Sequence, residues 1–283
     1  LNLLENRAGY LNTGTWSDKA IKEARMFQEV LEVASSKDAN FNYIPKKYVI
    51  PSNLDYFHCT SNNTIFGTQM KEFPKLDIPL VCDMSSDIFS RSLDFSKFDL
   101  IYAGAQKNMG PAGTTLVIIK EDILGKVSRQ IPSMMDYKVQ ISKDSMFNTP
   151  PVFAVYTSML TLEWLKGLGG IEAIEKENFK KSRLMYSEID LNPLFKGFAA
   201  NADRSTMNAT FSLTDDKLKI DFVTILMNLK IVQEPSENTI KPIKKQISNN
   251  PKCLLIQKKD QKLSRNEKCE ATGKKFKNCC GAL

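Results

Sequence analysis

Histidine is nearly absent from this sequence, whose 283 residues contain only one, His58, in the stretch DYFHCTSNN. With no second histidine, a Ser-His-Asp arrangement and a histidine-based metal site both have little support. The stretch around His58 is apolar and is typical of a strand. A buried core imidazole is therefore the favoured interpretation of this residue.

Long apolar runs are absent as well. No segment approaches the roughly 18 consecutive apolar residues of a membrane-spanning helix, and the first residues lack the basic, apolar and small-residue order of a secretory signal. Without such a signal, the six cysteines are expected to be reduced thiols. We therefore expect a soluble, cytoplasmic protein with no membrane partner. Because the chain opens at Leu1 inside an apolar stretch, without an initiator methionine, we also expect it to be a piece of something longer.

A net positive charge is lacking outside the end of the chain. The formal net charge is +7, and the segment from Lys230 onward holds thirteen basic residues against five acidic ones, which leaves the preceding residues at about −1. Any attraction to anionic partners therefore belongs to this tail. No specific nucleic-acid site is predicted for the body of the chain.

Short apolar runs recur in the first half of the chain. Four of them end in small or polar residues, at 55–63, 78–86, 98–108 and 114–122. The first three have the β-rich composition and the flanking turn residues of buried strands in a parallel sheet.

Helical patterns lie before and after these runs. One covers residues 17–33, with Ser17 as its expected N-cap. Another begins at Thr149 and Pro150, because proline lacks an N–H that the first helical position does not need. The mixture of strand and helix patterns predicts an α/β fold, a three-layer sandwich around a mostly parallel sheet.

The pattern changes after Leu191. RSTMNATFSLTDD is typical of a strand and turn, and KIDFVTILMNLK of a short helix, which together indicate a smaller α+β unit. The polar, basic stretch QEPSENTIKPIKKQISNN then indicates a flexible linker. We therefore expect a large domain over 1–195, a partial small domain over 196–232, and a basic, cysteine-containing tail over 233–283.

Polar groups follow three of the expected strands. Thr64 comes after the first, Asp83 after the second, and Gln106 with Lys107 after the third. Ligands of open α/β sheets bind beyond the carboxyl ends of the strands, so we expect these groups to share one rim. An amine, a carboxylate and hydroxyl donors are what a pyridoxal phosphate site needs.

At these residues the sequence resembles a known family. The blocks VCDMSSDIFSR and AGAQKNMGPAGTT, with NTGTWSDKA and TSNNTIFGT before them and NTPPVFAVY after them, resemble the phosphoserine aminotransferases. These are class-V aminotransferases, pyridoxal phosphate enzymes of fold type I that act in serine biosynthesis. The resemblance runs from about Leu1 to about Val232, and it implies an incomplete fold-type-I transferase.

The resemblance implies roles for the residues nearest the cofactor ring. Lys107 matches the catalytic lysine that forms a Schiff base with pyridoxal phosphate. Asp83 matches the carboxylate that pairs with the pyridine nitrogen, and Trp16 matches the indole that stacks on the ring. The freed amine of Lys107 would then shuttle the substrate's α-proton, a role that a lowered lysine pKa favours.

Further positions match residues that hold the cofactor phosphate in the family. Thr64 and Gln106 would do so within one subunit. Asn148 and Thr149 would reach the phosphate of the partner subunit, which implies a homodimer with shared sites. The implied reaction moves an amino group from glutamate to 3-phosphohydroxypyruvate, giving phosphoserine and 2-oxoglutarate.

Each of these residues also has a purely structural interpretation. Taken alone, Lys107 is a solvated charge in a loop, and Asp83 is a residue that caps a turn. Trp16 and Ile21 could form a hydrophobic staple around the expected N-cap. The Asn148–Pro150 segment has a sufficient account as a helix start.

Parts of the family pattern are missing from the chain. The glycine-containing cofactor motif and a His-Arg pair would precede Leu1, and a glycine-rich segment with further His and Arg contacts would follow Val232. Because phosphates and carboxylates are bound by arginine forks, these gaps affect the substrate more than the cofactor. We therefore expect a chain truncated at both ends, with weak pyridoxal phosphate binding and little activity on its own.

The last residues resemble a different protein. SRNEKCEATGKKFKNCCGAL is similar to the zinc-binding tail of the preprotein-translocase ATPase, with Cys269, Cys279 and Cys280 as the remaining candidate ligands. Three thiols fall one short of a tetrahedral structural zinc site, unless a group such as Cys253 joins them. The alternative to an enzyme is accordingly a non-enzymatic interaction protein that uses a basic, zinc-binding tail, and the alternative for the tail is a disordered basic segment.

Overall fold

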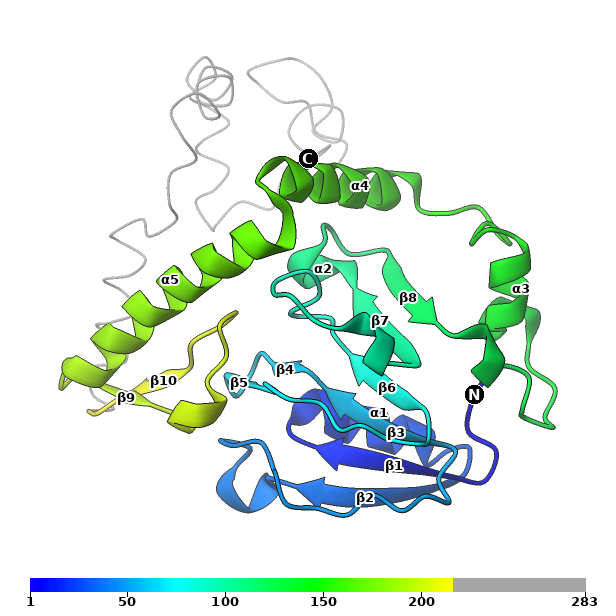
Figure 1. The fold of residues 1–283 in the computed structure, drawn as a ribbon, viewed down its shortest axis with the longest axis horizontal. Helices are drawn as coiled ribbons and strands as arrows, with labels where there is room; N and C mark the ends of the chain where they lie inside the picture. The colour runs from blue at the N-terminus through cyan, green and yellow to red at the C-terminus, as the bar shows by residue number, and fades with distance from the viewer. Residues whose placement is uncertain (216–283) are drawn as a thin grey trace, which may run out of the picture. The chain divides into compact units, whose positions relative to one another are not determined.

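A six-stranded sheet organises residues 1–215, the part of the chain that the computed structural model describes (Figure 1). Its strands, in the order β2-β1-β3-β6-β7-β8, are β2 (Glu29–Ser35), β1 (Arg7–Asn12), β3 (Tyr56–Thr60), β6 (Leu80–Asp83), β7 (Leu100–Gly104) and β8 (Thr115–Ile119). All neighbouring strands are parallel except β7 and β8. The expectation of an α/β fold with a mostly parallel sheet is confirmed.

The remaining elements are helices and two small ribbons. The α-helices are α1 (Thr15–Ala24), α2 (Ala105–Asn108), α3 (Tyr137–Ser142), α4 (Val152–Gly167) and α5 (Gly170–Leu191). The antiparallel ribbons are β4 (Asn62–Asn63) with β5 (Thr68–Gln69), and β9 (Phe195–Gly197) with β10 (Phe211–Leu213). Short 3-10 helices lie at Lys37–Ala39, Phe95–Lys97, Glu121–Ile123, Ser133–Met135 and Asn201–Asp203. Among the helices of residues 1–215, none combines the length and the apolar character needed to cross a bilayer.

Both faces of the sheet are buried, as a parallel sheet requires. Side chains alternate along each strand, so Phe57 and Cys59 of β3 enter one apolar cluster and Tyr56 enters the other. Helix α1 contacts β1, β2 and β3 and contributes Ile21 and Ala24 to the second cluster. The carboxyl ends of the parallel strands therefore form one rim, with the start of α1 beside it (Figure 1).

The helix expected over residues 17–33 is wrong in both extent and cap. Helix α1 ends at Ala24, and the residues from Glu29 onward form β2, which pairs with β1 in parallel. The N-cap is Gly14, and Ser17 lies three residues inside the helix. From there its Oγ accepts a hydrogen bond from the Gly14 N–H at 2.9 Å, which is the return half of a capping box.

The helix expected from Thr149 begins later, at Val152, with Pro151 as its N-cap. Two consecutive prolines delay it, because the residue before a proline disfavours helical backbone angles. The strand expected in RSTMNATFSLTDD is β10.

Some expectations concern residues outside the described part of the chain. The helix in KIDFVTILMNLK, the tail over 233–283 and the candidate zinc ligands Cys269, Cys279 and Cys280 all lie there. The division of the body into domains over 1–195 and 196–232 stays a prediction.

Candidate active site

Lys107 lies at the rim, on the short helix α2 that follows β7 directly. Its Nζ donates a hydrogen bond to the Thr64 hydroxyl at 2.9 Å and lies 5.1 Å from the centre of the Trp16 ring. The amine is thus held between a polar group and an aromatic face contributed by two other parts of the chain. Lys107 is exposed, but its amine has two partners that a freely solvated lysine would lack.

Trp16 comes from the first turn of α1 and keeps 39% of its surface exposed. The ammonium groups of Lys19 and Lys107 lie 4.8 and 5.1 Å from its ring centre, which is the range of cation–π attraction. A hydrophobic staple requires a residue just before the N-cap, whereas Trp16 follows the N-cap Gly14 by two positions. That alternative is wrong, and the indole remains available to a ligand.

Asp83 is the last residue of β6 and lies opposite Thr60 on β3 and Tyr102 on β7. One of its carboxylate oxygens accepts a hydrogen bond from the Ser85 N–H at 2.9 Å. The turn-capping role left open by the sequence is therefore present. It occupies one of the two carboxylate oxygens and does not exclude a second role for the other.

Burial and the nearby carboxylates have opposite effects on the pKa of Lys107. Partial burial lowers the pKa of Lys107, while the negative charges of Asp83 and Asp87 raise it. Burial has the larger effect, so the amine loses its proton more readily than an exposed lysine does. A larger neutral fraction makes the amine a better nucleophile and base.

Thr64 contacts the Lys107 amine, whereas Gln106 precedes Lys107 on α2. The backbone carbonyl of Thr64 accepts a hydrogen bond from Asn208 Nδ2 at 2.8 Å, which fixes the loop that carries the threonine hydroxyl. The amide of Gln106 folds over Gly104, where an added Cβ would come within 2.6 Å of its Oε1. Because Gly104 has no side chain, the Gln106 side chain can occupy this space.

Asn148 and Thr149 are not part of this group. Both are exposed, in the segment that joins α3 to α4, and within residues 1–215 neither hydrogen-bonds to Lys107, Thr64 or Asp83. The rim residues thus come together within one chain, whereas the side chains of Asn148 and Thr149 contact none of them within residues 1–215. Their assigned role in a neighbouring subunit stays a prediction.

A buried polar network behind the rim was not predicted. Asp87 and Arg91 form an ion pair of 2.9 Å with almost no exposure, and Asp87 also accepts a hydrogen bond from the Ser61 hydroxyl. Asn62 Nδ2 donates to Ser86 Oγ at 2.9 Å and thereby joins the turns after β3 and β6. The four-residue spacing of Asp87 and Arg91 was the one available sequence signal.

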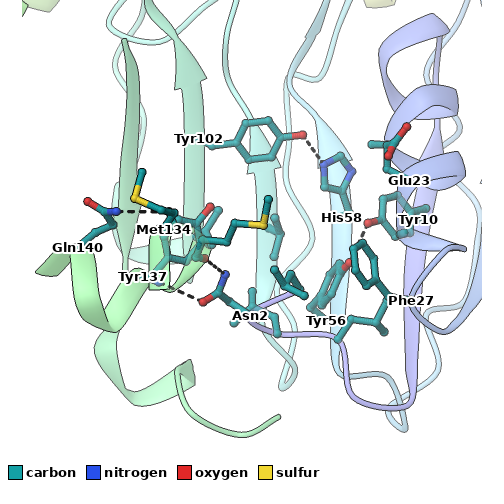
Figure 2. A pocket seen from close by; sticks show the side chains of 18 residues that line it. Asn2, Tyr10, Glu23, Phe27, Tyr56, His58, Tyr102, Met134, Tyr137 and Gln140 are labelled. Carbon is teal, nitrogen blue, oxygen red and sulfur yellow. Dashed lines mark hydrogen bonds between the residues drawn. The ribbon is translucent and has the colours of Figure 1, made fainter. Parts of the chain in front are cut away.

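His58 is buried, as expected, but it is not fully satisfied. Its Nε2 shares a hydrogen bond of 2.9 Å with the Tyr102 hydroxyl, while Nδ1 has no partner among the described residues. Both residues line a pocket of about 580 Å³ on the face covered by α1 (Figure 2). The same pocket is lined by Tyr10 and Tyr56 and includes neither Lys107 nor Asp83.

The donor set at the rim fits pyridoxal phosphate. An amine with a depressed pKa, a carboxylate on the neighbouring strand end, an accessible indole face and a hydroxyl all face one region. These groups match the cofactor's aldehyde, ring nitrogen, ring face and phosphate in charge and hydrogen-bonding capacity. Within residues 1–215, no cluster of three or more histidine, cysteine or acidic side chains is placed to hold a metal ion.

Comparisons with known proteins place the chain in a family. The family model described as Aminotransferase class-V matches residues 9–232. A phosphoserine aminotransferase from Flavobacterium psychrophilum is 69% identical over 209 residues, which cover 74% of this chain and 59% of the relative.

Solved structures give the same result. A phosphoserine aminotransferase from Bacillus circulans subsp. alkalophilus is 39% identical with a TM-score of 0.77, covering 79% of this chain and 63% of that one. A pyridoxal phosphate-bound phosphoserine aminotransferase from Trichomonas vaginalis is 33% identical with a TM-score of 0.74, covering 81% and 66%. The chain thus spans about three fifths of the length of the curated relatives it matches.

Proposed function

Because the chain belongs to the class-V aminotransferase family, we propose that it transfers amino groups with the help of pyridoxal phosphate. One observation carries the proposal. The Lys107 amine is held 2.9 Å from the Thr64 hydroxyl and over the Trp16 ring, next to the strand end that bears Asp83. A solvated surface lysine would have none of these partners.

The rim residues have complementary tasks toward the cofactor. When bound, pyridoxal phosphate supplies an aldehyde carbon that amines attack and a ring that withdraws electron density from the substrate's Cα. The Asp83 carboxylate would hold a proton on the ring nitrogen, and Trp16 would cover one face of the ring. Thr64 and Gln106 would donate hydrogen bonds to the phosphate.

Lys107 would serve as both nucleophile and proton carrier. Burial lowers its pKa, which makes the neutral form of Nζ more accessible than in a fully solvated lysine. The neutral Nζ can take a proton from the substrate's Cα and give it back later in the transfer. The Thr64 hydroxyl accepts a hydrogen bond of 2.9 Å from Nζ and thereby orients the amine.

We propose phosphoserine and 2-oxoglutarate as one substrate pair, and 3-phosphohydroxypyruvate and glutamate as the other. Relatives at 52–69% identity carry the name phosphoserine aminotransferase, which supports this assignment. The reaction would form phosphoserine as a step of serine biosynthesis. The two cysteines of the described part, Cys59 and Cys82, are free and buried, which suits the reducing cytoplasm.

We propose that the chain acts as a homodimer with shared sites. Helix α4 exposes a series of large apolar side chains, among them Val152, Phe153, Tyr156 and Trp164. Such a surface is unusual for a monomer and suits a subunit interface. Asn148 and Thr149 immediately precede it, so an interface here would bring them to a neighbouring site.

A single-turnover assay tests the proposed activity. Protein loaded with pyridoxal phosphate is mixed in stoichiometric amounts with O-phosphoserine, and the loss of the visible band and the formation of 3-phosphohydroxypyruvate are followed. We expect turnover with phosphoserine and none in the matched variant Lys107→Arg, which keeps the charge but not a titratable amine. Equal traces for the two proteins would refute the assignment.

A further inference from the structure

A buried imidazole and a phenol meet beside the candidate active site. His58 of β3 is 3% exposed, and its Nε2 lies 2.9 Å from the Tyr102 hydroxyl of β7. Strand β6, which ends at Asp83, lies between these two strands. Figure 2 shows the two side chains pointing towards each other at the inner end of the pocket.

The strand register brings Asp83 next to this pair. Thr60 of β3 lies opposite Asp83, and Asp83 lies opposite Tyr102, so these three residues form one row across the sheet. His58 precedes Thr60 by two positions and therefore points to the same face. The Tyr102 hydroxyl hydrogen-bonds to His58, which lies two residues before the row that contains Asp83 and Tyr102. This hydrogen bond passes over β6, the strand that ends at Asp83.

The imidazole is held firmly from its other side. The Tyr10 ring stacks on His58 with a centroid distance of 4.7 Å and an interplanar angle of 25°. The Tyr10 hydroxyl in turn shares a hydrogen bond of 2.7 Å with the Tyr56 hydroxyl. A ring fixed by stacking and by one hydrogen bond can orient its partner hydroxyl without moving.

The imidazole is also neutral, which suits a place beside Asp83. Burial lowers the pKa of His58 to about 4, and the Asp83 charge opposes that effect. The other titratable side chains around this pocket are Glu23 on α1, Tyr10, Tyr56 and Tyr102 on the sheet, and Tyr137 on α3. A protonated imidazole would neutralise Asp83 and compete with a cationic ligand for it, whereas a neutral one leaves the carboxylate its full charge.

We propose that His58 and Tyr102 are positioning residues for Asp83, with the imidazole fixing the Tyr102 side chain and Tyr102 fixing the carboxylate. This inference rests on the proposed function in one respect, since the group that Asp83 faces is the ring nitrogen of pyridoxal phosphate. The pair touches neither cofactor nor substrate. It acts through the orientation of Asp83.

The first test uses the cofactor-free protein. Because the chain has a single histidine, its imidazole gives one set of nitrogen signals in a ¹H–¹⁵N correlation spectrum. We expect these signals to shift in Tyr102→Phe, and the pKa of His58 to fall further in Asp83→Asn, which removes the charge that raises it. Tyr137→Phe is the matched control, because Tyr137 lines the same pocket and its hydroxyl hydrogen-bonds to neither His58 nor Tyr102.

The second test measures cofactor binding. We expect the Kd for pyridoxal phosphate to rise about tenfold in Tyr102→Phe, with a changed pH midpoint of the visible band, and Tyr137→Phe to match the native chain. Circular dichroism checks that each variant folds. Imidazole signals insensitive to both Tyr102→Phe and Asp83→Asn, or unchanged affinity and midpoint in Tyr102→Phe, would overturn the inference. A native chain that binds no pyridoxal phosphate would overturn the proposed function instead, and the imidazole spectra would still decide the coupling.

Discussion

Lys107 shows how one side chain acquires its chemistry from neighbours that are distant in sequence. Thr64 and Trp16 contact its amine, while Asp83 and Asp87 act on it through their charge. Thr64 and Asp83 were predicted at this rim because each follows a strand, whereas Trp16 was predicted only through the family resemblance. Asp87 could not be predicted, since its role depends on how the turn after β6 folds back.

Loss of the Asp83 charge should make the Lys107 amine more acidic. The carboxylate raises the pKa of Lys107 against the larger effect of burial, so Asp83→Asn is expected to lower that pKa further. Competitive acetylation of the cofactor-free chain across a pH series, read on the Lys107 peptide by mass spectrometry, measures it. Asp77→Asn, an exposed carboxylate before the start of the same strand, is the control and should leave the Lys107 profile unchanged. An Asp83→Asn profile identical to the native one would show that the two groups do not interact.

His58 should make the fold sensitive to mild acid. Its pKa is about 4 in the folded chain against 6.5 for the free side chain, so between these pH values only the unfolded chain binds the extra proton. The free energy of unfolding should therefore decrease as the pH falls, by about 1.4 kcal/mol per pH unit from this residue. Urea denaturation from pH 7 to 4 measures the slope, and His58→Gln should be flatter by that amount. Equal slopes in the two proteins would mean that His58 does not remain neutral when buried.

At the scale of elements, the expected strands are present and the errors fall where local preference and tertiary pairing disagree. The runs at 55–63, 78–86, 98–108 and 114–122 contain β3, β6, β7 and β8. β2, with the sequence EVLEVAS, was predicted as helix because its glutamates, leucine and alanine favour helices. Parallel pairing with β1 outweighs that preference, which local sequence cannot reveal.

The positions of the candidate site residues were predicted better than the hydrogen bonds that hold the surrounding turns. Asp83, Gln106 and Lys107 stand at strand ends, a position that a strand pattern locates well. The hydrogen bond between Asn62 and Ser86 depends on two turns meeting in space, and no periodicity in the sequence reports that meeting.

The buried ion pair after β6 should be essential to the turn that carries Asp83. Asp87→Ala would leave Arg91, with about 10% of its side chain exposed, without its counter-charge, and should lower the free energy of unfolding by about 3–5 kcal/mol. Urea denaturation at neutral pH measures this loss. Glu177→Ala removes an exposed pair with Lys180 and is the matched control, with a much smaller expected loss because solvent screens exposed ion pairs. Similar losses in both variants would show that the turn does not depend on the buried pair.

At the scale of the whole molecule, the described part of the chain leaves apolar surface exposed on α4. Val152 and Phe153 are 68% and 76% exposed, directly after the segment with Asn148 and Thr149. The sequence could not predict this surface, because an apolar helix is equally typical of a core element.

Charge placed on α4 should therefore change the assembly. We expect the native chain to elute as a dimer and Phe153→Asp to elute as a monomer, because a buried unpaired charge destabilises an apolar interface. Size-exclusion chromatography with light scattering measures the mass. Leu184→Asp on α5, at 74% exposure, is the matched control and should stay dimeric. A monomeric native chain, or the same mass for both variants, would contradict an interface at α4.

The central claim is that Lys107 and Asp83 bind the same cofactor ring, and borohydride trapping tests it most directly. The protein is incubated with pyridoxal phosphate, reduced, digested and analysed by mass spectrometry. We predict a pyridoxyl phosphate group on Lys107, absent from that position in Lys107→Arg, and a weaker yield at limiting cofactor in Asp83→Asn. A label spread evenly over surface lysines, at the same total in the native chain and in Lys107→Arg, would contradict the account.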